Sequence, residues 1–356
     1  MSLRRAFRPL RVSLVLLSAV APAHGQSALL TLPDVSQHAR TTQRIGLTDI
    51  TIDYHRPLVA GRKIFGGLQP YGEVWRAGAN YNTTIAFSDS VRVEGHALAP
   101  GTYGLHMIPG QSSWVVIFSH NSTSWGSFTY DSTEDALRVR VTPHSIPNEE
   151  VLSYSFDDPK PSSVTVTMRW ADVAVPFHVD IDVPHIVARD LRLQLRGRVQ
   201  TEWQPWEEVA NYLLENSLDA NEALRDADQS IQIEDRFENE ITRVRALRAL
   251  GRTAEADSTQ TRAIGMGTQA QVYGFARTLQ RLGQQQAALD IFRQDVRKHP
   301  GTWMSHLEAA RIAVGSSDYP RAIEETKTAA ALAPPAMKGT LQEVVTQLQN
   351  RVDINR

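Results

Sequence analysis

The hydrophobic pattern of this chain changes once, near Pro184, and that change constrains the fold more than any other feature. Between residues 48 and 183 apolar and polar residues alternate with period two, as at Ile50, Ile52 and Tyr54. About eight or nine such runs, separated by turn signals, predict an antiparallel sandwich or barrel. After Pro184 glycine is sparse and helix-forming residues dominate. The sequence therefore predicts an all-β sandwich domain followed by an all-α domain.

The helical half contains a weak internal repeat. Pro300 and Pro334 are 34 residues apart. Ala288, Phe292 and Pro300 resemble the Ala-x3-Phe…Pro part of the tetratricopeptide pattern, in which the alanine allows two helices to approach closely. An unrelated helical bundle is the alternative. A last helix over about residues 337–352 is expected to cap the stack. The repeated alanines are spaced 33, 32 and 34 residues apart, at Ala223, Ala256, Ala288 and Ala322.

The first 25 residues have the order of a secretory signal peptide. Four arginines without an acid precede the short apolar run 12–20, and small residues follow at Ala21-Pro22-Ala23. Such an order predicts cleavage and export, and the run is too short to span a bilayer. The expected location is periplasmic or secreted. The expected division is a signal peptide 1–25, an N-terminal linker 26–42, a β-sandwich domain 43–183, a linker 184–202 and a tetratricopeptide-like domain 203–356.

Composition excludes several functional classes. The chain has no cysteine, which rules out disulfides, thiolate metal sites and a cysteine nucleophile. Removing the four N-terminal arginines from 37 basic residues leaves 33 against 39 acidic ones. An acidic protein is a poor partner for nucleic acid, so none is expected. No other segment reaches transmembrane length, and no membrane span is predicted.

The stretch from Tyr54 to Phe87 interrupts the alternation and is the best candidate for a functional site. Its prolines and glycines preclude a long helix or strand, yet its aromatic residues are too apolar for a solvated linker. A structured loop clamped between two strands is expected, and such loops commonly carry function. The candidate ligand-binding residues, including one histidine from a later strand, are Arg56, Arg62, Tyr71, Trp75, Arg76, Asn80, Tyr81 and His106.

Short motifs in this half carry a family resemblance: Arg56-Pro57, Gly61-Arg62-Lys63-Ile64-Phe65-Gly66, Pro70-Tyr71-Gly72, Val74-Trp75-Arg76-Ala77-Gly78-Ala79-Asn80, Pro100-Gly101-Thr102-Tyr103 and Trp125-Gly126. Over about residues 43–183 the chain resembles the exported bacterial domain-of-unknown-function family numbered 2911. The family usually reads Gly-Ala-Asn-Glu, whereas Tyr81 stands at the place of the glutamate in this chain. The resemblance implies a β-sandwich-like domain outside the cytoplasm and no established activity.

Two interpretations of the arginines are open. Arginine forks bind carboxylates and other anions bidentately, and the aromatic residues with Asn80 would then contact a sugar or a planar ligand. In the alternative, the arginines pair with Asp49, Asp53 or Glu73 and bind loop carbonyls, while the aromatic residues plug one end of the sandwich.

The histidines give no metal-binding pattern. No His-x-His, His-x3-His or HExxH spacing occurs, so no metal and no cofactor are expected. His106 alternates with Leu105 and Met107 and should lie on the opposite face of its strand, exposed or hydrogen-bonded.

The function expected from these features is an exported, soluble, non-enzymatic binding or scaffold protein. The β domain would take a small anionic or carbohydrate ligand, and the helices would bind an unidentified protein or peptide. The alternative is an envelope hydrolase acting on carbohydrate or ester with His106, or a carboxylate near Arg76, as acid or base. Arg62, Arg76 and Asn80 lining one pocket with His106 and a carboxylate would favour the enzyme.

Overall fold

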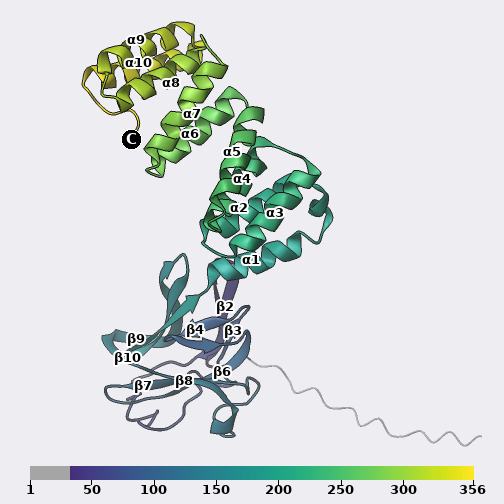
Figure 1. The fold of residues 1–356 in the computed structure, drawn as a ribbon. Coiled ribbons are helices and arrows are strands. Elements are labelled where there is room, and N and C mark those ends of the chain that lie inside the picture. The colour runs from purple at the N-terminus through teal and green to yellow at the C-terminus, as the bar shows by residue number, and fades with distance from the viewer. Residues whose placement is uncertain (1–32) are drawn as a thin grey trace, which may run out of the picture.

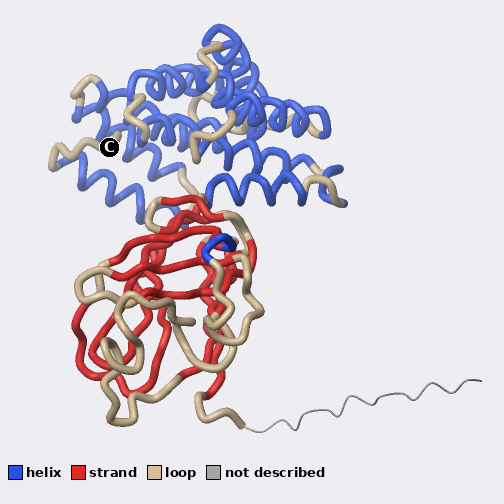
Figure 2. Tube along the Cα trace, turned by 90° about the horizontal axis from the view of Figure 1, so that it is seen from below, coloured by secondary structure: helices blue, strands red, loops and turns tan. Residues whose placement is uncertain are grey.

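The computed structural model describes residues 33–356, which form a β domain followed by ten α-helices (Figure 1). The strands and the α-helices occupy separate parts of the molecule, and the β domain contains one short 3₁₀ helix at Ser132–Glu134 (Figure 2). The predicted fold class is confirmed. The signal peptide expected at residues 1–25 lies outside the described residues.

Two antiparallel sheets form the β domain. The first has the order β1-β2-β3-β6-β7-β8, with strands Gln37–Ile45, Thr48–Arg56, Thr84–Phe87, Gly101–Ile108, Trp114–Ser119 and Asp135–Val141. The second has the order β5-β4-β10-β9, with strands His96–Leu98, Val91–Val93, Ser163–Ile181 and His144–Lys160. The inner faces of the two sheets share one core. Phe118 of β7 meets Phe177 of β10 edge to face, with ring centroids 5.8 Å apart.

Strand β10 is longer than the sequence suggests. The alternation breaks after Trp170, and two short strands are expected there. The structure contains one strand with register shifts on either side of Ala171, whose φ is +53°. A β-bulge explains the difference, because an extra residue reverses the inward and outward pattern without ending the strand.

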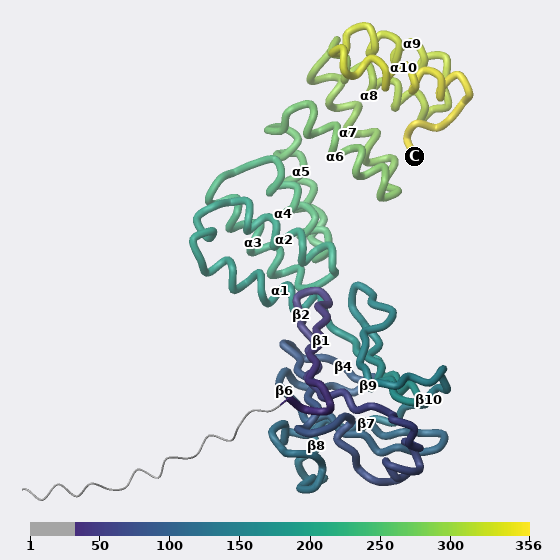
Figure 3. The backbone as a smooth tube through the Cα atoms, turned by 180° about the vertical axis from the view of Figure 1, so that it is seen from behind, coloured from purple at the N-terminus to yellow at the C-terminus, as the bar shows by residue number. Residues whose placement is uncertain are grey.

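The two expected linkers contain secondary structure. Within the segment 26–42, β1 begins at Gln37 and pairs with β2. Most of its side chains are exposed, so the strand lacks the alternation that would reveal it. Within the segment 184–202, helix α1 (Val183–Gln194) buries Ile186 in the core of the β domain and Ala188 among the helices. Arg189 of α1 also pairs with Asp89. Helix α1 therefore joins the two domains directly, as Figure 3 shows.

Four helical hairpins and a last helix follow α1. The predicted alanines all lie on the second helix of a hairpin and are completely buried, as expected for close helix contact. No helix in residues 33–356 has the length and apolarity needed to cross a membrane. The helices are α2 (Trp203–Glu215), α3 (Ala220–Ile233), α4 (Phe237–Ala249), α5 (Thr253–Met266), α6 (Gln269–Arg281), α7 (Gln285–Lys298), α8 (Trp303–Gly315), α9 (Tyr319–Leu332) and α10 (Pro335–Gln349).

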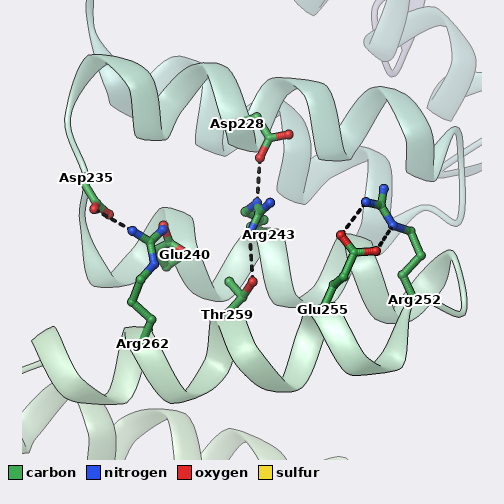
Figure 4. Close-up of polar contacts among 8 residues, drawn as sticks. All are labelled: Asp228, Asp235, Glu240, Arg243, Arg252, Glu255, Thr259 and Arg262. Atoms are coloured by element: carbon green, nitrogen blue, oxygen red, sulfur yellow. Dashed lines mark hydrogen bonds and ion pairs between the residues drawn. The ribbon is translucent and has the colours of Figure 1, made fainter.

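Polar contacts link the neighbouring helices α3, α4 and α5. Arg243 of α4 donates to Asp228 of α3 at 2.7 Å and to Thr259 of α5 at 2.8 Å (Figure 4). Arg262 of α5 pairs with Glu240, which is completely buried on α4. The pair Arg243–Asp228 therefore joins the first hairpin to the second, and the contacts of Arg243 with Thr259 and of Arg262 with Glu240 fix the two helices of the second hairpin against each other.

Candidate functional site

The loop between β2 and β3, residues 57–83, is held against β6 by main-chain hydrogen bonds. Trp75 and Met107 each donate an N–H to the carbonyl of the other at 2.8 Å. The N–H of Gly72 donates to the carbonyl of Pro109 at 2.9 Å. The loop is therefore structured along its length, as the sequence predicts.

Aromatic side chains pack beneath this loop. Trp75 stacks on Trp170 of β10 with ring centroids 5.6 Å apart, and Phe65 meets Trp114 edge to face at 4.8 Å. The indole N–H of Trp75 donates to the carbonyl of Gly78 at 3.1 Å. Trp75 is thus a core residue that supports the loop, and its ring faces away from solvent.

Of three other candidates, Tyr71 and Tyr81 lie on the surface and Asn80 is half-buried. Tyr71 is 44% exposed, and Tyr81 is 61% exposed beside His55, with ring centroids 6.2 Å apart. Asn80 has a positive φ of +59°, which asparagine tolerates better than most residues. Its amide reaches the carbonyl of Ser36 at 3.5 Å.

The arginines of the loop do not pair with the predicted acids. Asp49 binds Arg44 at 2.6 Å and Asp53 binds Arg40 at 2.9 Å, both from the neighbouring strand β1. Glu73 makes no ion pair within residues 33–356. This part of the alternative interpretation is wrong, because β1, whose strand signal is weak, supplies the partners of these acids. Arg56, Arg62 and Arg76 each lack a carboxylate partner in the described part of the chain.

Main-chain carbonyls take the place of those acids. The Nε of Arg56 donates to the carbonyl of Leu152 at 3.0 Å. The Nε of Arg62 donates to Val59 at 3.0 Å and its Nη2 to Leu58 at 2.5 Å. These bonds fix the side chains of the arginines but do not neutralise their charges.

A cavity of about 570 Å³ opens beside the loop, and both Arg62 and Arg76 line it. Trp170 also contributes to its wall. The lining contains no acidic residue and includes neither Asn80 nor His106. Arg62 and Arg76 therefore line one cavity, but the other residues that would favour an enzyme, namely Asn80, His106 and a carboxylate, do not line it.

Arg76 is half-buried between this cavity and a pair of aromatic rings. Its Nη1 donates to the carbonyl of Asn80 at 2.5 Å, and burial lowers the pKa of its guanidinium. The guanidinium lies 5.5 Å from the ring of Trp125 and 6.0 Å from that of Phe128, at distances of cation–π contact. These rings stack at 5.7 Å and are 58% and 77% exposed. Neither ring is among the site residues predicted from the sequence, although Trp125 belongs to a motif of the resemblance.

Gly126 allows Arg76 to reach these rings. Its φ is +77°, and an added Cβ would lie 2.7 Å from Nη1 of Arg76. We expect Gly126→Ala to lower the free energy of unfolding by about 1–2 kcal/mol for the left-handed backbone alone, and by more through the clash. Gly72→Ala is the matched control, because its φ is +82° but no atom lies within 4 Å of the added Cβ. Urea unfolding of both variants measures the difference, and equal losses would contradict the role of the contact.

His106 is buried on the outer face of its sheet, because the loop 121–131 covers it. Its Nδ1 lies 3.0 Å from the hydroxyl of Ser127, and its ring meets Tyr130 edge to face at 5.2 Å. Burial lowers the pKa of His106 to about 4, against the raising effect of the Asp135 charge. His106 is therefore neutral at neutral pH. His106 thus lies on the face of its strand opposite Leu105 and Met107 and is hydrogen-bonded, as the sequence predicts.

The hydrogen bonds of His106 do not suit it to activate Ser127. The amide nitrogen of Asn82 donates to the carbonyl of Asn121 at 3.2 Å and lies 3.4 Å from Nε2 of His106. An amide N–H is a donor, so Nε2 accepts and the proton resides on Nδ1, facing the serine. To act as a general base toward Ser127, His106 would need an unprotonated Nδ1 that accepts the hydroxyl proton.

No group of three or more metal-ligating side chains is assembled within residues 33–356.

The chain was compared with known families, curated proteins and solved structures. Residues 36–179 match the sequence model of the family described as Protein of unknown function (DUF2911), as the resemblance predicts. No curated protein matches the chain. Its helical region is similar to part of the Cut9 and Hcn1 hetero-tetramer of APC/C, at 18% identity and a TM-score of 0.29, over 46% of this chain and 34% of that one. It is also similar to YrrB, titled a TPR protein with an unusual peptide-binding site, at 14% identity and a TM-score of 0.27. This match covers 45% of this chain and 84% of that one. This chain thus spans about a third of the first of these.

Proposed function

We propose that this chain, a DUF2911-type β-sandwich joined to a stack of helical hairpins, is an exported, non-enzymatic binding protein. The β domain takes a small anionic ligand, and the helices bind another protein. One observation carries the proposal: Arg62 and Arg76 line one cavity, and neither pairs with a carboxylate of residues 33–356. Export rests on the order of residues 1–25.

The cavity suits a small oxyanion. Nη1 of Arg62 and both Nε and Nη2 of Arg76 make no hydrogen bond within residues 33–356 and are available as donors. Guanidinium donors of this kind bind carboxylate and phosphate oxygens strongly. A volume of about 570 Å³ lies in the range of small-molecule sites. The aromatic pair beside Arg76 supports a ligand that also carries a sugar or planar group.

The helical stack supplies a second surface. A groove of about 670 Å³ runs along α2, α4 and α6, the first helices of successive hairpins. Its lining includes the apolar residues Phe237, Ile241 and Phe275 and charged residues such as Glu238 and Arg245. Grooves lined by successive repeats are where solenoid proteins commonly bind partners.

Anion binding is tested with the full chain and three probes, namely inorganic phosphate, citrate and glucuronate. We expect at least one to bind, and Arg62→Gln and Arg76→Gln each to weaken it about tenfold or more, since a hydrogen bond to a charged group contributes about 1.5–3 kcal/mol. Titration calorimetry measures the affinities.

Arg40→Gln is the matched control, because Arg40 is an exposed arginine of the same domain that pairs with Asp53 outside the cavity. It should leave binding unchanged. Binding of none of the three probes, or an equal loss in all three variants, would contradict the proposal.

A further inference from the structure

Residues 353–355, named here the docked segment, fold back onto the helices. After α10 ends at Gln349 the chain returns to α6 and α8, and the end marked C lies near α6 in Figures 1 and 3. Ile354 is buried with apolar side chains of α8 and α10, including Val314 and Leu348. Asn355 is only 3% exposed. The docked segment therefore fills the space between the first helices of two adjacent hairpins.

The side chain of Asn355 forms hydrogen bonds with two helices. The amide of Gln280 on α6 donates to Oδ1 of Asn355 at 2.9 Å, and Nδ2 of Asn355 donates to the carbonyl of Arg311 on α8 at 2.9 Å. Its N–H donates to the carboxylate of Asp353 at 2.9 Å, which turns the segment. Such paired side-chain contacts are those by which a groove recognises an extended peptide.

Two arginines converge on one carbonyl of the docked segment. Nη1 of Arg277 donates to the carbonyl of Ile354 at 3.2 Å, and Nη1 of Arg311 donates to the same oxygen. Arg311 is only 7% exposed, and its Nε donates to the hydroxyl of Tyr273 at 3.0 Å. Neither arginine forms an ion pair with a carboxylate of residues 33–356.

The guanidinium groups of Arg277 and Arg311 carry more positive charge than the carbonyl of Ile354 balances. Burial, and then the charge of Arg311, lower the pKa of Arg277. A neutral carbonyl offers partial charge only, whereas a carboxylate at the same place would accept from both guanidinium groups and neutralise one of them. The electrostatics of the site therefore favour a group more negative than the one now seated there.

We propose that the groove between α6 and α8 binds the C-terminal carboxylate of a partner peptide whose last residue is aliphatic, and that the docked segment competes with it. A terminal carboxylate replaces the Ile354 carbonyl while leaving the aliphatic side chain in its place. Because the docked segment is tethered, it competes at an effective concentration on the order of millimolar. This inference builds on the proposed scaffold role of the helices and is independent of the anion site of the β domain.

The test uses fluorescein-labelled Arg-Val-Asp-Ile with a free carboxylate, and the same peptide with a C-terminal amide. Both are titrated against the intact chain, the undocked variant Ile354→Asp/Asn355→Ala, and the control Val352→Ala, which changes an exposed neighbour. We expect the undocked variant to bind the carboxylate peptide at least tenfold more tightly than the amide. It should also bind that peptide at least tenfold more tightly than the intact chain and the control do.

Arg277→Gln in the undocked variant should abolish the preference for the carboxylate. Equal affinity for both peptides, equal affinity of intact and undocked chains, or no binding by an undocked variant that retains its helical circular dichroism would each overturn the proposal. If the double variant unfolds, Asn355→Ala alone is judged by the same criteria. Phosphate and citrate binding, measured on the same samples, separates failure here from failure of the β-domain proposal.

Discussion

Replacing Trp170 by alanine is expected to lower the free energy of unfolding of the β domain by about 3–5 kcal/mol. Trp170 is almost completely buried, stacks on Trp75 and lies 6.0 Å from Phe65, edge to face. The side chain of Trp170 therefore packs the loop 57–83 against strand β10. The substitution would leave a void that neighbouring rings cannot close, because Trp75 is fixed by its main-chain bonds to β6.

Urea unfolding followed by tryptophan fluorescence measures this loss, and far-ultraviolet circular dichroism reports mainly on the helices. The fluorescence transition should shift more than the helical one. Trp170→Phe is the control, since it retains an aromatic ring and removes an indole N–H that has no hydrogen-bond partner within residues 33–356. It should cost less than Trp170→Ala, because it leaves a smaller void. A loss below about 1 kcal/mol for the alanine variant would show that the loop does not depend on Trp170.

Replacing Glu308 by glutamine is expected to stabilise the helical domain by about 1–4 kcal/mol near pH 8, because the acid must take up a proton on folding at this pH whereas glutamine need not. Glu308 of α8 is completely buried beside Asp295 of α7 and Gln269 of α6. The carboxylate oxygens of both acids lack hydrogen-bond partners within residues 33–356, and His299 lies 3.7 Å from Asp295. Burial, and then the charge of Asp295, raise the pKa of Glu308 from 4.5 to about 9.

The pH dependence has a definite sign. An acid whose pKa is higher in the folded state binds its proton more tightly there, so stability is greatest below the unfolded pKa of 4.5. Stability should then fall as the pH rises toward about 9. The difference between Glu308→Gln and the unchanged chain should therefore grow across this window.

Thermal unfolding at several pH values measures that difference. The exposed Glu324 of α9 supplies the control, since Glu324→Gln should change stability by less than about 0.5 kcal/mol at every pH. A constant difference between Glu308→Gln and the unchanged chain from acid to alkaline pH would contradict the assignment.

Local patterns in the sequence were sufficient for the domain classes. Period-two alternation predicted the sheets, and the buried alanines of the hairpins were found from spacing alone, because helices that approach closely leave room only for a small side chain. The structured loop was also predictable, since its glycines and prolines exclude regular structure while its aromatic residues require burial.

The sequence by itself thus determined where the chain is pleated, where it is helical and which loop joins two strands, because these depend on residues close together along the chain. Only the tertiary structure decided the partners of distant groups. Asp49 and Asp53 pair with arginines of β1 and not with the loop arginines. Arg62 and Arg76 line one cavity, and a loop covers His106. The tertiary structure also brought Ile354 to Arg277 and Arg311, 77 and 43 residues away. Partners so far apart in sequence leave no periodic signal, since their contact depends on how the chain closes in space.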